Sequence, residues 1–95
     1  MSNPPAPGST VTIQDFSFSP ASLTITAGTT VHWMNNGPSA HTTTSDTGIW
    51  DSGILNAPGG SFDFTFTQPG TFPYHCRLHP PNLYPGFTGT ITVTP

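Results

Sequence analysis

Apolar and polar residues alternate along most of the sequence, and the alternation is clearest between residues 62 and 67. There the run F-D-F-T-F-T places three phenylalanines on one face and polar residues on the other, which is typical of a strand with one buried face. Helical periodicity appears nowhere. The other expected strands are 10–19, 22–26, 30–35, 41–45, 72–76 and 88–94. The pattern predicts an all-β protein, an antiparallel Greek-key β-sandwich or barrel of about seven or eight strands.

Three segments depart from regular alternation. Within 10–19 the apolar phase slips by one position, which predicts a bulge or bend near Gln14 and Asp15. Residues 46–61 have no clear period, so we expect an irregular excursion there. Its apolar residues, expected to cover the core, are Ile49, Trp50, Ile54 and Leu55. Residues 1–9 are rich in proline and predict a flexible tail before a single domain at 10–95.

Charged residues make up only 5% of the 95-residue chain, and its net charge is −3. Arg77 is the only Lys or Arg, which excludes a basic surface for nucleic acid and a polybasic anchor for anionic lipid.

No apolar run approaches the ~20 residues that span a bilayer. The residues after Met1 are polar and proline-rich, so the sequence shows no signal peptide. We expect a monomer.

The only cysteine, Cys76, ends an expected strand, and His79 follows it on a short loop. A thiolate and an imidazole held so closely suit a soft or borderline transition metal, and His41 is the obvious source of a third ligand. Zinc prefers four firm ligands, and a fourth is hard to find here, so our hypothesis is a copper site. The alternative is a buried, inert thiol in a metal-free β-sandwich module.

Strand parity adds a geometric expectation to this hypothesis. Phe72, Tyr74 and Cys76 fall on one face of their strand. If the aromatic rings belong to the core, the thiol points inward as well, while His79 reaches the ion from the loop. We therefore expect a thiolate shielded from water and one imidazole near the surface, an arrangement that lets electrons in and out.

Three stretches of the sequence resemble the cupredoxins, and within them the branch of plastocyanin and amicyanin. These stretches are 31–42, 51–76 and 89–93, and their most specific parts are the W-x-N-N…H segment and the run Y-H-C-x-x-H-P. The resemblance covers nearly the whole chain after Ser9. It implies one copper ion in a type 1 (blue) site and a one-electron carrier, not an enzyme, that passes electrons between extracytoplasmic redox partners.

Carried over residue by residue, the resemblance makes His41, Cys76 and His79 the copper ligands. It places Asn35 and Thr42 where family members tie the two ligand loops together by hydrogen bonds. These bonds fix the ligand geometry before metal arrives. A copper storage or delivery protein remains an alternative function.

The axial position departs from the family pattern. In this branch the second histidine begins H-P-x-M-x-G, whereas this chain reads H-P-P-N-L-Y-P-G-F-T-G after Leu78. Alignment from the C-terminal side puts Phe87, an apolar and non-ligating residue, in the methionine slot. A weak oxygen from Asn82 or from the Ala40 carbonyl is the second interpretation, and water admitted by the longer loop is the third. The apolar residues around His79 are interpreted as a docking face for redox partners: Pro80, Pro81, Leu83 and Tyr84.

Overall fold

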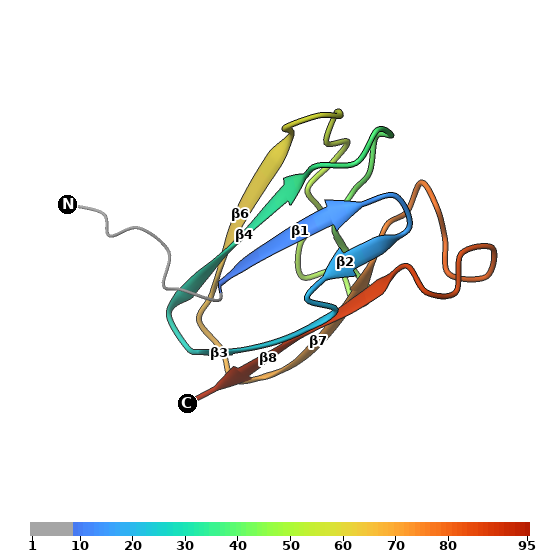
Figure 1. The fold of residues 1–95 in the computed structure, drawn as a ribbon. Helices are drawn as coiled ribbons and strands as arrows, with labels where there is room; N and C mark the ends of the chain where they lie inside the picture. The colour runs from blue at the N-terminus through green and yellow to red at the C-terminus, as the bar shows by residue number, and fades with distance from the viewer. Residues whose placement is uncertain (1–8) are drawn as a thin grey trace.

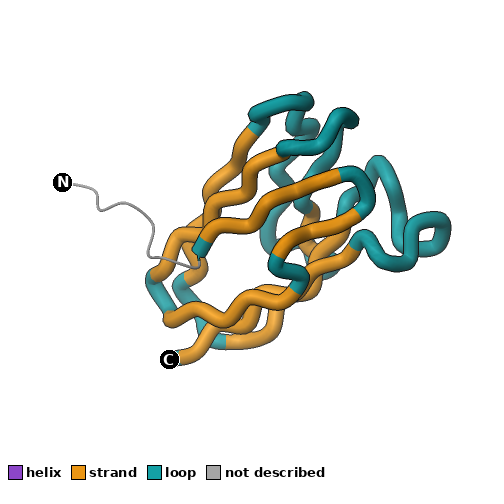
Figure 2. The backbone as a smooth tube through the Cα atoms, in the orientation of Figure 1, coloured by secondary structure: helices purple, strands orange, loops and turns teal. Residues whose placement is uncertain are grey.

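A computed structural model describes residues 9–95. These residues form a two-layer β-sandwich (Figures 1 and 2). The predicted tail lies outside the described residues, except for Ser9, which is buried and whose carbonyl accepts the N–H of His32. No helix occurs among residues 9–95, and so none that could cross a membrane. The strands are β1 Thr10–Gln14, β2 Ser17–Ser19, β3 Ser22–Thr26, β4 Thr29–Asn35, β5 Thr44–Ser45, β6 Ser61–Phe66, β7 Gly70–His75 and β8 Thr88–Thr94.

The strands form two four-stranded sheets, in the orders β2-β1-β4-β6 and β3-β8-β7-β5. The all-β sandwich is therefore confirmed, but the expectation of purely antiparallel sheets is wrong. β1 pairs with β4 in parallel, and β3 pairs with β8 in parallel. Alternation reports which residues share a face of a strand and carries no information about the direction of its neighbour.

The expected bulge near Gln14 is a chain reversal. β1 and β2 form a hairpin in which Gln14 pairs with Ser17 and the turn residues are Asp15 and Phe16. Phe16 has a φ of 68°, in the left-handed region that a bulky side chain rarely adopts. The slip in apolar phase thus marked the point where the chain turns back on itself.

Aromatic rings dominate the core between the sheets. Trp33 is fully buried and meets the ring of Tyr74 edge-on, with ring centroids 5.5 Å apart. The prediction that four apolar residues of the irregular excursion cover the core is correct for two of them. Trp50 and Leu55 are buried, whereas Ile49 and Ile54 are exposed.

Three connections gather at one end of the sandwich, and the C-terminus lies at the other (Figure 1). They are the β1–β2 turn, the loop after β4 and the loop between β7 and β8. Aromatic contacts join the first to the third, because the ring of Phe16 stacks on that of Tyr84 at 4.7 Å. The fold thereby brings residues 15–16, 36–43 and 76–87 together.

Candidate metal centre

His41, Cys76 and His79 converge at this end, with one ligand atom of each within 4.8 Å of the others. The Nδ1 atoms of the two histidines are 3.3 Å apart, and the Cys76 Sγ lies 3.9 Å from that of His41 and 3.7 Å from that of His79. The point equidistant from the three atoms lies about 2.1 Å from each, close to the ~2.0–2.1 Å of a zinc–nitrogen bond and about 0.2 Å shorter than a zinc–sulfur bond. The donor set and its spacing fit a single copper ion.

Local structure explains how each donor reaches the centre. His41 forms an isolated antiparallel β-bridge with Leu55. Its N–H donates to the Leu55 carbonyl, and its own carbonyl accepts the N–H of Leu55. Cys76 directly follows β7, and its carbonyl accepts the N–H of His79 at 3.3 Å, which closes a tight turn. His41 and Cys76 are fully buried and His79 is half-buried. The thiol therefore lies inside and one imidazole near the surface, as strand parity predicted.

Thr42 connects the two loops that carry these side chains. Its backbone N–H donates to the Cys76 Sγ at 3.3 Å, and its Oγ1 accepts the N–H of Arg77 at 3.0 Å. Both bonds cross from the loop after β4 to the loop after β7. These two hydrogen bonds therefore fix the distance between the Cys76 sulfur and the loop that carries His41.

Asn35 has a different set of partners from the one expected. Its Nδ2 donates to the carbonyls of Ser39 and Leu55, both at 2.9 Å, and its Oδ1 accepts the N–H of Gly37 at 3.0 Å. These bonds hold the His41 loop against the excursion before β6. None of these bonds reaches the loop of Cys76, so the expectation that Asn35 joins the two ligand loops needs this correction.

Aromatic rings surround the two imidazoles. The ring of Phe87 is fully buried and stands edge-on to that of His41, with centroids 4.9 Å apart. Phe16 and Tyr84 each meet the His79 ring edge-on, at 5.2 and 5.0 Å. Asn82, the other residue considered for the axial position, is exposed on the loop.

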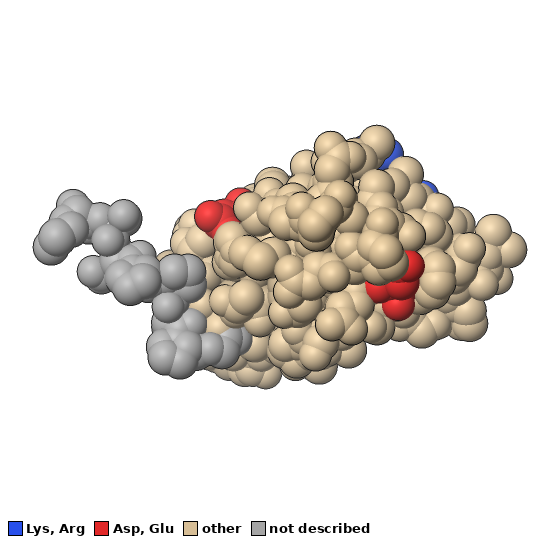
Figure 3. Space-filling view, turned by 45° about the horizontal axis from the view of Figure 1, so that its top comes forward, with Lys and Arg blue, Asp and Glu red and all other residues tan. Residues whose placement is uncertain are grey.

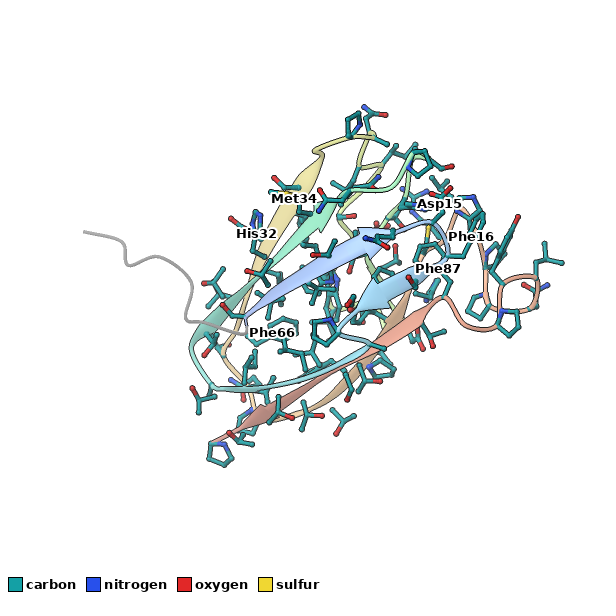
Figure 4. The ribbon with its side chains drawn as sticks, viewed as in Figure 1. Asp15, Phe16, His32, Met34, Phe66 and Phe87 are labelled. Carbon is teal, nitrogen blue, oxygen red and sulfur yellow. The ribbon has the colours of Figure 1, made fainter. Side chains whose placement is uncertain are left out.

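Two residues of the β1–β2 turn belong to the centre and were missed by sequence reasoning. Figure 4 shows Asp15 and Phe16 beside Phe87, at the end of the sandwich away from Phe66. The Oδ1 of Asp15 lies 2.8 Å from the Nε2 of His41. Burial raises the pKa of Asp15, but hydrogen bonds from His41 and Ser39 outweigh it and hold the pKa below its ordinary value. Phe16 could have been noticed in the sequence, because a large apolar residue at a turn that should face solvent indicates a contact with another part of the protein.

The surface next to His79 is apolar. Leu83 is 70% exposed and Phe16 43% exposed, while Pro80, Pro81 and Tyr84 are half-buried. Most of the face drawn in Figure 3 carries neither basic nor acidic side chains. The described cation nearest to His79 in the chain, Arg77, pairs with Asp51.

Comparison with known proteins identifies the family. The model of the cupredoxin-like domain matches residues 3–94. The chain is 40% identical over 86 residues to a plastocyanin of Scenedesmus fuscus. The aligned region covers 80% of this chain and 85% of that plastocyanin. It is 30% identical over 74 residues to the amicyanin of Paracoccus denitrificans, covering 74% of this chain and 56% of that relative. The chain spans about half the length of the chloroplastic plastocyanins that it also matches.

A solved structure agrees with these relatives. The purple cupredoxin of Nitrosopumilus maritimus superposes with a TM-score of 0.74 at 27% identity, covering 90% of this chain and 98% of that one. Sequence, fold and the grouping of one thiol with two imidazoles all point the same way. The chain belongs to the cupredoxin family, as a member of the plastocyanin and amicyanin type.

Proposed function

We propose that this protein is a mononuclear type 1 copper protein, a one-electron carrier whose ligands are His41, Cys76 and His79. The observation that carries the proposal is the triangle of the Cys76 Sγ and two imidazole Nδ1 atoms. Its three sides of 3.3, 3.7 and 3.9 Å surround a position suited to one ion. One copper ion is the cofactor of this family type, and it supplies the Cu(I)/Cu(II) couple.

The chain's own residues prepare the centre for this role. The N–H of Thr42 donates to the Cys76 sulfur and thereby stabilises a thiolate inside the protein. The bonds of Asn35 and Thr42 hold the His41 loop in place without metal. Since the donors are already arranged, a change of oxidation state requires little movement of the protein.

Phe87 supports an apolar axial position. Its buried ring packs edge-on against His41, in the slot where the family pattern has methionine. An aromatic ring offers no lone pair to the oxidised ion, so we infer a reduction potential above that of a Met-ligated relative. Met34 is exposed on β4, on a different part of the molecule from Phe87 (Figure 4).

The exposed apolar surface suits weak docking of redox partners at the edge of His79. We define the docking face by five residues: Phe16, Pro80, Pro81, Leu83 and Tyr84. Phe16 extends the face predicted from the sequence, since its ring stacks on Tyr84. Apolar groups around a half-buried ligand favour brief, non-polar contact at the point where electrons leave. Extracytoplasmic location, which the resemblance to the family implies, is part of the proposal.

The proposal is tested by adding Cu(II) to the metal-free protein and recording the visible spectrum before and after a reductant. We expect one equivalent of copper, intense thiolate-to-Cu(II) absorption that disappears on reduction, and a reversible voltammetric wave. The Cys76→Ser variant should lose the absorption. A colourless oxidised copper-loaded protein contradicts the proposal, and rapidly exchanging Cu(I) without a reversible wave favours copper storage or delivery.

A further inference from the structure

Three Asp–His pairs occur within residues 9–95, and only one involves a residue of the metal centre. Asp63 pairs with His32, and Asp46 pairs with His75; both of these histidines are partly exposed. Asp15 instead pairs with His41, whose side chain is fully buried, at 2.8 Å. The carboxylate therefore approaches the ring on the nitrogen opposite the one that faces Cys76.

The position of this carboxylate is fixed by the loop that carries His41. The N–H and the Oγ–H of Ser39 donate to the two oxygens of Asp15 at 3.3 and 3.1 Å. Gly37 packs so closely that a Cβ there would lie 2.9 Å from both the Asp15 N and its Oδ1. The turn and the loop thus form one packed unit, in which Asp15 has little freedom to leave the imidazole.

We propose that Asp15 is a positioning residue for the copper centre, which holds His41 as the Nε2–H tautomer and lowers the reduction potential. The argument rests on the proposed function for the ion itself. A carboxylate only accepts hydrogen bonds, so the Nε2 must donate, and the Nδ1 is left with the lone pair that a metal needs. The negative charge also makes the imidazole a stronger donor, which stabilises the oxidised ion more than the reduced one.

The tautomer can be read in the metal-free protein. We expect ¹⁵N NMR of the wild-type imidazoles to show a proton on Nε2 of His41 and none on Nδ1. In Asp15→Ala, which removes the acceptor, we expect a mixture of tautomers. A wild-type His41 protonated on Nδ1 alone would overturn the proposal, whatever the variants do and whether or not the chain binds copper.

The effect on the ion is measured with two variants that each remove one negative charge, Asp15→Asn and Asp63→Asn. In Asp15→Asn we expect the Cu(II) affinity to fall about tenfold more than the Cu(I) affinity, which equals a rise of about 59 mV in potential. Asp63→Asn should leave the ratio of the two affinities unchanged, because His32 lies on the sheet face. Equal ratios in the two variants would overturn the proposal. Failure of the wild type to bind copper would instead refute the proposed function.

Discussion

Gly89 of β8 lies directly beneath the ring of Tyr74, its partner across the sheet. A Cβ on Gly89 would sit 2.4 Å from the Cζ of Tyr74 and 2.5 Å from its hydroxyl oxygen. The absence of a side chain at 89 therefore leaves room for the buried ring of Tyr74, two residues before Cys76. This contact links the packing of the sandwich to the strand that delivers the sulfur.

Gly89→Ala should destabilise the protein, because the added methyl group forces the buried ring of Tyr74 to move. Overpacking of this kind costs about 1–3 kcal/mol. The measurement is the free energy of unfolding in urea. Gly86→Ala is the matched control: nothing lies within 4 Å of a Cβ at that position, so it should change the stability little. Equal stability of the two variants would contradict the contact.

Tyr74 should make the protein sensitive to alkali. Burial raises the pKa of Tyr74 to about 12, against 10.0 for the unperturbed group. Between these values the unfolded chain has lost the phenolic proton and the folded chain keeps it, so stability is full below pH 10 and falls as pH rises toward 12. The loss is about 3 kcal/mol over this window.

The check is the pH profile of urea unfolding for the wild type and for Tyr74→Phe. Removing the hydroxyl should flatten the decline above pH 10. The variant should fold, since phenylalanine fills the same space in the core as the ring of Tyr74. Parallel profiles for the two proteins would show that another group causes the alkaline loss.

Thr42→Val should weaken the connection between the two ligand loops. The change keeps the N–H that faces Cys76 but removes the Oγ1 that accepts the N–H of Arg77. Leaving a donor of this kind without its partner costs about 1–3 kcal/mol, measured by thermal or urea unfolding of the metal-free protein. As control, Thr30→Val removes a hydroxyl that bonds to Thr65 on the exposed sheet face, where we expect a change within about 0.5 kcal/mol.

Phe87→Met should lower the reduction potential and change the visible spectrum of the copper-loaded protein. The thioether places a weak donor beside His41, and such a donor stabilises the oxidised ion. Voltammetry and absorption spectra of wild type and variant provide the measurement. Phe66→Met makes the same exchange in the core away from the centre and should leave both unchanged. An unaltered potential in Phe87→Met would remove Phe87 from the axial position.

Part of the centre could be predicted because its residues carry their own chemical signal. A cysteine with a histidine on the next loop suits a soft or borderline metal, and the W-x-N-N…H and Y-H-C-x-x-H-P motifs indicate the family. Parity along 72–76 placed the sulfur inside, since side chains alternate by backbone geometry alone. These inferences needed only local sequence. The roles of His41, Cys76 and His79 as copper ligands stay predictions.

Local pattern was enough to predict that the chain is all-β, which face of 72–76 is buried and which side chains can hold a metal, but it merged the hairpin strands β1 and β2 into one. The tertiary structure decided how the strands pair, that Gln14 and Ser17 face each other across a hairpin, and that Asp15 and Phe16 reach His41 and His79. These contacts join residues 26 and 63 positions apart. Alternation and motif spacing describe neighbours along the chain, whereas contacts at such separation depend on how the two sheets pack.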